Sequence, residues 1–208
     1  MLITLEGIDG SGKSTLHASL KDLLSDLDPL MTREPGATWV GDQVRRAIKE
    51  QTDPITEATL FVADHAAHLA KVVRPALAEG RLVISDRYSD SRYAYQSATL
   101  QGIVPEPEKW LRAMHNGWTI IPDKTFLCML PIDEALTRLK PDIEREHFEK
   151  RETLEKVQNN YLTYAKAEPG RFVIVDAMLS PEIVARFVAD AIRVDWETGK
   201  KKRKGRKK

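Results

Sequence analysis

The sequence contains a single cysteine, Cys128, so one chain can form neither an internal disulfide nor a cluster of thiolate metal ligands. It also lacks any unbroken run of roughly 18 apolar residues, the length that a membrane-spanning helix requires. The first residues, MLITLEGIDG, lack the basic stretch and apolar segment of a secretory leader. We therefore expect a cytoplasmic protein with no membrane contact and a buried thiol at Cys128.

Neither sign of charge dominates, because 32 Lys and Arg stand against 31 Asp and Glu in 208 residues. Eight of the basic residues, however, lie in the last nine positions, and without them the balance is 24 minus 31, or −7. We expect disorder from about Gly199 and interpret residues 200–208 as a basic tail, either solubilising or in loose contact with RNA or DNA. Residues 1–199 fit a single domain.

Short β-rich runs alternate with longer helical patterns along the chain. The runs are residues 2–6, 29–32, 81–86, 124–130 and 171–176. Most are almost continuously apolar, as are strands that helices cover on both faces. The alternation predicts an α/β fold of three layers, α/β/α, around a five-stranded parallel sheet.

The helical patterns occupy the intervals between these runs. Leucines at spacings of three and four form one apolar stripe over residues 16–27, and a longer pattern covers residues 56–77 before Gly80. A charged pattern over residues 144–167 follows Pro141, and a last helix over residues 182–194 has Ser180 as its N-cap. Because Pro141 is a natural hinge, we expect a short helical lid at about residues 137–150.

The strongest motif, GIDGSGKS over residues 7–14, fits G-x-x-x-x-G-K-[ST] between a predicted strand and a predicted helix. Its glycines let backbone N–H groups surround a polyphosphate, at which the helix N-terminus points its positive dipole end. Lys13 supplies a point charge for the β- and γ-phosphates, and the Ser14 hydroxyl is a ligand for Mg²⁺. The predicted ATP-binding residues are Gly7, Asp9, Gly10, Ser11, Gly12, Lys13, Ser14 and Thr15.

A phosphate-binding loop alone does not distinguish a kinase from a GTPase, a motor or a helicase. The guanine-reading pattern N-K-x-D does not occur, and motors and helicases are usually longer chains. A compact phosphotransferase remains, and it needs arginines to bind the phosphate of its acceptor.

Several segments together resemble the thymidylate kinase family over nearly all of residues 1–195. They are LEGIDGSGKST at 5–15, TREPG at 32–36, LFVADH at 60–65 and SDRY at 85–88, which Ser91 and AYQ at 94–96 follow. The resemblance implies a P-loop fold, ATP and Mg²⁺ as cofactors, dTMP as the acceptor, dTDP and ADP as products, and a homodimer.

The resemblance also assigns roles to single residues. It places Asp86 at Mg²⁺ with Ser14, Asp9 beside the acceptor sugar and the metal, and Arg87 and Arg45 at the acceptor phosphate. Phe61 would stack on the base, Tyr95 would disfavour a ribose 2′-hydroxyl, and His65 stands where many members have a base-binding arginine. The predicted acceptor site comprises Asp9, Glu34, Pro35, Arg45, Phe61, His65, Arg87, Ser91 and Tyr95.

The interior of the phosphate-binding loop, IDGS, contains no arginine, so the resemblance implies that the lid supplies the catalytic positive charge. Our first prediction for this residue is Arg145 and our second is Arg138. The predicted catalytic residues are Asp9, Lys13, Arg87, Arg138 and Arg145.

Other interpretations remain open at this point. His65 and Arg92 are unusual for the family, which leaves a kinase for another nucleoside monophosphate or a deoxynucleoside as an alternative. A different class of protein, a nucleic-acid-associated ATPase, would use the basic tail as its main contact. Phe61 is also compatible with a core position, Arg45 with a solvated helix face, and Asp86 and Arg87 with a plain surface ion pair.

Overall fold

The computed structural model describes residues 1–139 and 147–205, and its centre is a five-stranded parallel sheet with the strand order β2-β3-β1-β4-β5. The strands are β1 (Leu2–Glu6), β2 (Leu30–Arg33), β3 (Val83–Asp86), β4 (Lys124–Met129) and β5 (Phe172–Asp176). All five predicted strands are confirmed, with boundaries that differ by at most two residues.

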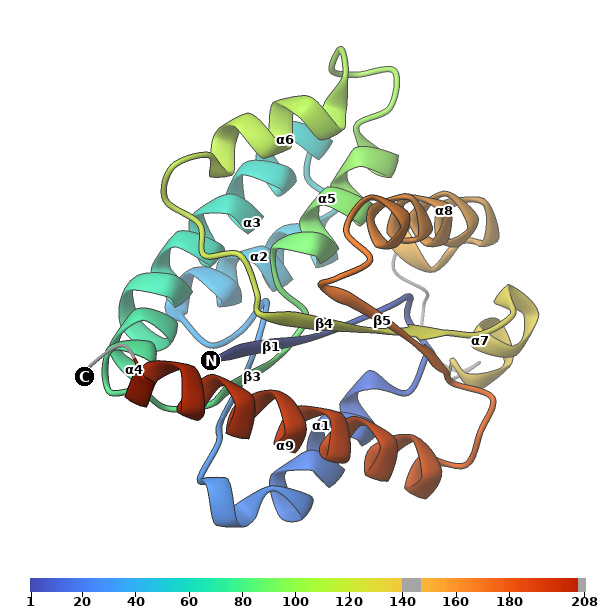
Figure 1. Ribbon diagram of the computed structural model, residues 1–208. Helices are drawn as coiled ribbons and strands as arrows, with labels where there is room; N and C mark the ends of the chain where they lie inside the picture. The colour runs from blue at the N-terminus through green and yellow to red at the C-terminus, as the bar shows by residue number, and fades with distance from the viewer. Residues whose placement is uncertain (140–146, 206–208) are drawn as a thin grey trace.

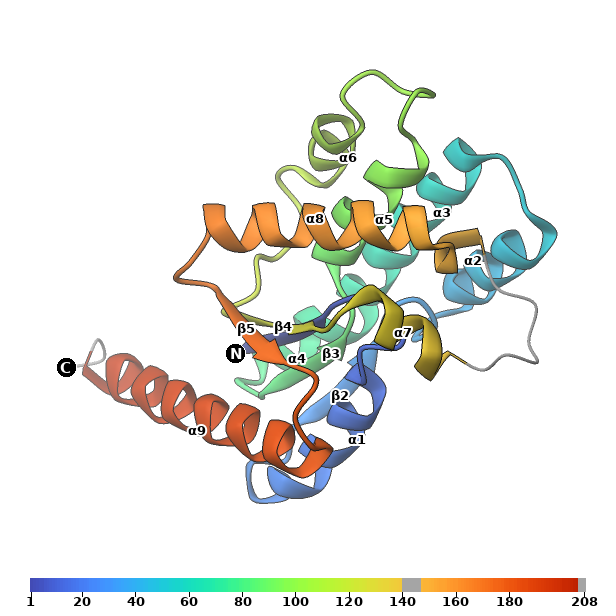
Figure 2. The ribbon, with the colours of Figure 1, turned by 90° about the vertical axis from the view of Figure 1, so that its right-hand side faces the viewer.

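Helices cover both faces of the sheet, as the three-layer prediction requires (Figure 1). The helical elements are α1 (Lys13–Leu23), η1 (Ser25–Leu27), α2 (Trp39–Glu50), α3 (Pro54–His68), η2 (Leu69–Val73), α4 (Arg74–Ala78), α5 (Ser89–Thr99), α6 (Pro107–His115), α7 (Ile132–Arg138), η3 (His147–Glu149), α8 (Arg151–Ala167) and α9 (Pro181–Gly205). Helices α1 and α9 pack together on one face, and α3, α5 and α8 lie on the other (Figure 2).

The sheet register brings together chain segments that are far apart in the sequence. Leu5 pairs with Asp86 of β3, and Glu6 pairs with Leu127 of β4. The loops that follow β1, β3 and β4 therefore leave the same edge of the sheet, where α/β proteins place their ligands. The apolar side chains of these strands form the buried core beneath that edge.

The long helix predicted over residues 56–77 is interrupted. It consists of α3, one π-helical turn at Leu69–Val73, and α4. Pro75 explains the wider turn, because proline has no N–H group and its ring clashes with the carbonyl four residues earlier. The sequence pattern identified the helix but not the turn that offsets its two halves.

The C-terminal end differs from our expectation. We predicted disorder from Gly199, whereas α9 continues through Gly205, and the last three residues of the tail lie outside the described part of the chain. Lysine and arginine are good helix formers, so a run rich in them is compatible with a helix that continues. At the other end of α9, Ser180 accepts a hydrogen bond from the Ile183 N–H (3.4 Å), which confirms the predicted cap.

The sequence also predicts a buried thiol at Cys128 and no membrane-spanning helix. Cys128 is buried as predicted, and burial raises the pKa of its thiol to about 11. Within residues 1–139 and 147–205, no helix is long and apolar enough to span a membrane.

Candidate active site

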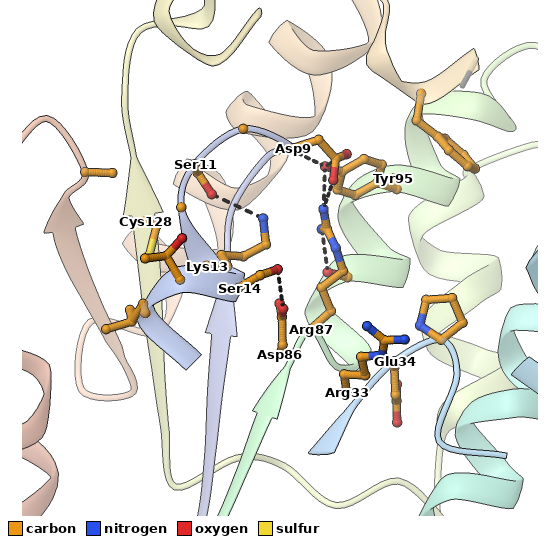
Figure 3. Close-up of a pocket in the computed structure, with 18 of the residues that line it drawn as sticks. Asp9, Ser11, Lys13, Ser14, Arg33, Glu34, Asp86, Arg87, Tyr95 and Cys128 are labelled. Atoms are coloured by element: carbon orange, nitrogen blue, oxygen red, sulfur yellow. Dashed lines mark hydrogen bonds and ion pairs between the residues drawn. The ribbon is translucent and has the colours of Figure 1, made fainter. Parts of the chain in front are cut away.

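The predicted phosphate-binding loop joins β1 to α1 at the ligand-binding edge of the sheet (Figure 3). Gly10 has a φ of 80°, and a Cβ atom there would lie 2.4 Å from the Ala135 carbonyl oxygen. Gly12 caps α1 with a φ of 82°. The backbone therefore follows a path that side chains would block or strain at these glycines, which leaves the first N–H groups of α1 directed toward the cavity.

Lys13 lies in the first turn of α1, and its ammonium group is held over the loop. Its Nζ atom donates hydrogen bonds to the Ile8 carbonyl (2.7 Å) and the Ser11 hydroxyl (3.2 Å). Burial and the nearby Arg87 both lower its pKa. An ammonium group held in this way, close to further positive charge, gains stability from a bound anion.

Arg87 follows β3 and connects the loop to α5. Its guanidinium donates to the Gly7 carbonyl (3.1 Å), forms an ion pair with Asp9, and stacks 4.8 Å from the centre of the Tyr95 ring. The Tyr95 hydroxyl in turn donates to Asp9 (2.7 Å). Burial alone would raise the pKa of Asp9, but Arg87 and Lys13 outweigh burial and hold that pKa below its usual value. Asp9 is therefore ionised at neutral pH.

Asp86 and Ser14 meet at the foot of the loop, where the Ser14 hydroxyl donates to the Asp86 carboxylate (2.9 Å). The other carboxylate oxygen of Asp86 is buried and has no hydrogen-bond partner among the described residues. No group of three or more His, Cys, Asp and Glu side chains that could hold a metal ion occurs in the same part of the chain. The site thus suits a cation that takes most of its ligands from phosphate and water, as Mg²⁺ does.

The acceptor side of the cavity begins after β2, at Glu34 and Pro35, which a cis peptide bond joins. Arg45 of α2 donates to the Pro35 carbonyl (3.3 Å) and pairs with Asp42 (2.9 Å). Gly36 has a φ of 122°, and a Cβ atom there would lie 2.1 Å from the Arg45 guanidinium. This turn therefore requires glycine for Arg45 to reach the cavity.

An aromatic wall closes the cavity between the helices. Phe61 of α3 and Tyr95 of α5 both lie edge-on to Phe148 of η3, at centroid distances of 6.4 and 5.8 Å. Phe61 is only partly buried and lines the cavity, so one part of its ring remains open to a ligand. This position favours the predicted stacking role over a purely structural one.

The cavity has a volume of about 810 Å³ and collects most of the predicted site residues. Those that line it are Asp9, Gly10, Ser11, Gly12, Lys13, Ser14, Thr15, Glu34, Pro35, Arg45, Phe61, Asp86, Arg87, Ser91, Tyr95 and Arg138. Gly7, the first residue of the phosphate-binding loop, is the one predicted ATP-binding residue that does not line the cavity.

His65 does not contact this cavity, in contrast to our expectation that it would reach the base. Its side chain is 0% exposed, and its ring nitrogens hydrogen-bond to Glu34 (2.9 Å) and Thr119 (2.8 Å). The side chain that does line the cavity near Phe61 is Arg92. Imidazole is shorter than the arginine expected at position 65, so the buried Glu34 and Thr119 can satisfy both of its nitrogens.

A buried polar cluster surrounds Glu34. His65 and His68 each direct Nδ1 at its carboxylate, and Arg92 forms an ion pair with it. The second nitrogen of His68 bonds the Thr32 hydroxyl (2.7 Å). Burial lowers the pKa of His65 to about 3 and that of His68 to about 4. Both rings are therefore neutral, donate through Nδ1, and accept from threonine hydroxyls through Nε2.

Glu6, at the end of β1, forms a second buried site below Arg87. Its carboxylate accepts hydrogen bonds from the Tyr88 N–H (2.9 Å) and the Tyr161 hydroxyl (2.7 Å), and also from Ser91 (2.5 Å). Burial and Asp90 raise its pKa to about 7. Because Ser91 bonds Glu6 and also lines the cavity, it joins this buried site to the cavity floor.

On the donor side, Arg138 of α7 lines the cavity, with Nε bonded to Glu134 (2.8 Å) and Nη1 bonded to the Ala177 carbonyl (3.0 Å). Arg145, our first prediction for the catalytic arginine, lies outside the described residues. So does the centre of the predicted lid, residues 140–146.

The sequence reasoning missed several residues of the cavity wall. Besides Arg92, they are Leu16, Arg33, Ile48, Gln96, Cys128, Phe148, Ala177, Leu179, Pro181 and Val184. One signal could have found the last four, because they follow β5 and the ends of parallel strands meet at one edge of the sheet. Phe148 gave no such signal, since its position depends on how η3 packs against α3 and α5.

The chain is similar to known proteins over nearly its whole length. A family model described as thymidylate kinase matches residues 5–188. A protein of Methanoculleus marisnigri named probable thymidylate kinase is 62% identical over 202 residues, which cover 97% of this chain and 98% of the relative. A Methanospirillum hungatei protein with the same name is 55% identical over 204 residues (98% and 99%). The crystal structure of thymidylate kinase from Ehrlichia chaffeensis matches with a TM-score of 0.72 and 28% identity, covering 92% of this chain and 98% of that one.

Proposed function

We propose that this chain, which belongs to the thymidylate kinase family and transfers the γ-phosphate of ATP to dTMP, performs the transfer in the cavity described above. The match to the family model extends over residues 5–188, which include all residues of the cavity wall. It favours dTMP kinase activity over the two alternatives left open by the sequence. The basic tail, on which the ATPase alternative depended, lies beyond the matched region.

The observation that carries this proposal is the convergence of three cations on one cavity from separate elements. Lys13 comes from the first turn of α1, Arg87 directly follows β3, and Arg45 lies in α2. Phosphoryl transfer depends mainly on positioning and charge stabilisation, so a phosphotransferase site needs fixed cations around both phosphates. Lys13 binds the donor phosphates, Arg45 binds the acceptor phosphate, and Arg87 lies between them, oriented by Asp9.

Mg²⁺ fits the pair formed by Ser14 and Asp86. Asp86 has one buried carboxylate oxygen that no described group satisfies, and Ser14 contributes a hydroxyl beside it. When bound there with the nucleotide, Mg²⁺ would neutralise phosphate charge. In this proposal Arg138, which α7 and the Ala177 carbonyl hold at the donor side, contributes positive charge over the phosphates. Arg145 remains a prediction.

Adjacent arginines of α2 allow a matched test of the acceptor site. Arg45 lines the cavity, whereas Arg46 is exposed and pairs with Glu50 (2.7 Å). We expect Arg45→Met to raise the KM for dTMP about tenfold or more, without a comparable change in the KM for ATP, because a charge-assisted contact to one phosphate is lost. Arg46→Met should leave both values unchanged. A coupled ADP-release assay with dTMP, dUMP, dCMP, dGMP and AMP measures this, and equal behaviour of the two variants would refute the assignment of Arg45.

Three further properties belong to the same proposal. The protein is a cytoplasmic homodimer, as its resemblance to the family implies, and light scattering coupled to gel filtration would reveal a monomer if this is wrong. The basic tail is either a solubilising segment or a site of loose nucleic-acid contact. Truncation after Gly199 distinguishes the two, because only nucleic-acid contact predicts a loss of salt-sensitive RNA or DNA binding.

A further inference from the structure

Arg92 is an unusual residue within the acceptor half of the cavity. It lies in α5, its side chain is 2% exposed, and yet it lines the cavity wall. Its Nε donates to the Phe61 carbonyl (3.1 Å), and Nη1 donates to the Tyr88 carbonyl (2.8 Å). The guanidinium is thus anchored on the backbone of the residue that is placed to stack on the acceptor base.

Some N–H groups of Arg92 have no hydrogen-bond partner among the described residues. A guanidinium has five N–H groups and no acceptor. Two of them bond the carbonyls of Phe61 and Tyr88, and a third pairs with Glu34. Two N–H groups remain for other acceptors, and an unpaired donor in a buried place is costly unless a ligand or water satisfies it.

Arg171 shows what a purely structural buried arginine looks like in the same chain. Its guanidinium bonds both carboxylate oxygens of Asp90, both of Glu168, and the Thr125 hydroxyl (2.8 Å). It is saturated, and it does not line the cavity. Arg92 differs on both counts, which a role confined to neutralising Glu34 does not explain.

The cluster around Glu34 fixes the direction of Arg92. The Glu34 carboxylate is held by the Nδ1 atoms of His65 and His68 as well as by Arg92, and all four side chains are buried. Because Glu34 binds one edge of the Arg92 guanidinium, the plane of the group is fixed and its other edge is free. His65 does not line the cavity, and it acts as a positioning residue because it binds Glu34, which orients Arg92.

A fixed guanidinium edge discriminates between bases by chemistry alone. It can donate to the keto oxygen at C4 of thymine or uracil but not to the amino group at C4 of cytosine, which itself presents N–H donors. Burial lowers the pKa of Arg92 to about 10, so the group remains a cation and a pure donor at neutral pH. A guanidinium has no acceptor atom, so Arg92 cannot accept a hydrogen bond from the amino group of cytosine.

We propose that Arg92 reads the keto oxygen of the acceptor base, so that the site selects keto pyrimidine nucleotides over cytosine nucleotides, with Glu34, His65 and His68 positioning its guanidinium. This inference rests on the proposed function of the cavity. It assigns base selection to α5 and to a buried carboxylate, in place of the α3 position that the sequence predicts.

The test compares dTMP and dCMP as acceptors in three variants. The Arg92→Lys variant retains the positive charge beside Glu34 but loses the planar pair of donors. A double variant, Glu34→Gln with Arg92→Gln, removes both charges together. In both, we expect the ratio of kcat/KM for dTMP to that for dCMP to fall about 10-fold to 100-fold, with an unchanged KM for ATP. Arg171→Gln is the matched control, which should lose stability but retain the wild-type ratio.

Each outcome separates this inference from the function on which it rests. If the wild type phosphorylates dTMP and both Arg92 variants retain its preference over dCMP, Arg92 is structural and the proposal is overturned. If only the double variant fails to fold, the Arg92→Lys ratio decides. If the wild type does not phosphorylate dTMP, the proposed function itself fails. Calorimetric titration of dTMP without ATP gives an independent readout, in which the Arg92 variants should bind less tightly.

Discussion

The two halves of the active site each contain an arginine–carboxylate pair, and the two pairs differ in exposure. Their arginines, Arg87 and Arg92, are five residues apart along the chain. Arg87 pairs with Asp9 at the phosphate end, where the two side chains are 17% and 31% exposed. Arg92 pairs with Glu34 at the base end, where both are 2% exposed. The first pair can exchange partners with a ligand, whereas the second can only present its free edge.

This difference in exposure determines what each pair contributes. Water reaches the first pair and partly screens it, so this pair should add less to stability than a fully buried one, and it is available for the reaction. A sealed pair is costly to form and still more costly to break, since the remaining charge would be buried without a partner. Substitutions in the phosphate half should therefore reduce activity with little loss of stability, whereas substitutions in the base half should reduce both stability and base selection.

Lys13→Ala tests the phosphate half and should have the largest effect. We expect turnover to fall at least 1,000-fold, about 4 kcal/mol in transition-state stabilisation, because the cation at the donor phosphates is lost. The free energy of unfolding should not decrease, since burial disfavours the Lys13 ammonium. Lys21→Ala, on the exposed end of the same helix, is the control. Activity within tenfold of the wild type would contradict the assignment.

Glu34→Gln tests the sealed pair. It leaves the Arg92 guanidinium buried without a counter-ion, and we expect the free energy of unfolding in urea to fall by about 3 kcal/mol. Asp9→Asn is the corresponding change in the open pair, and it should cost less than about 1 kcal/mol, because Arg87 retains its bonds to Gly7 and Ser91. Equal costs for the two variants would remove the basis of the comparison.

The buried histidines predict a pH dependence of stability. His68 has its pKa lowered to about 4 in the folded state against a usual value of 6.5, so between these values only the unfolded chain takes up the proton. Stability is therefore lost as the pH falls below 6.5. From pH 6.5 to 5.5 the wild type should lose about 1 kcal/mol more than His68→Gln. The measurement compares the two proteins, because Glu6, whose pKa is raised to about 7, increases the stability of both as the pH falls and cancels in the difference.

Thr32→Val should have the smallest effect. The Thr32 hydroxyl donates to His68 Nε2 at 2.7 Å, and valine keeps the shape while removing the donor. We expect a loss of about 1 kcal/mol in the free energy of unfolding. Thr163→Val, an exposed position whose hydroxyl bonds the Asn159 carbonyl, should change stability by less than about 0.5 kcal/mol. No difference between the two variants would mean that the cluster around Glu34 is less tightly coupled than its geometry indicates.

The residues of the phosphate half can be located from the sequence, because they lie in one contiguous motif between a strand and a helix. Lys13, Ser14 and the glycines are close in space because they are close in sequence. The base half could not be predicted in the same way. Glu34 meets His65, His68 and Arg92 only after β2, α3 and α5 have packed, and no local pattern encodes that meeting. The sequence alone therefore places His65 at the base and gives Arg92 no role.

The position of β1 at the centre of the sheet has a consequence for synthesis on the ribosome. The first strand to emerge must wait for both of its partners, β3 and then β4, and its second neighbour is complete only at Met129. Parallel pairing across such long separations is slow, because the intervening chain must be ordered first. The nascent N-terminal strand, which bears the phosphate-binding loop, thus stays unprotected for more than half of translation. During that interval, chaperone capture or aggregation competes with folding.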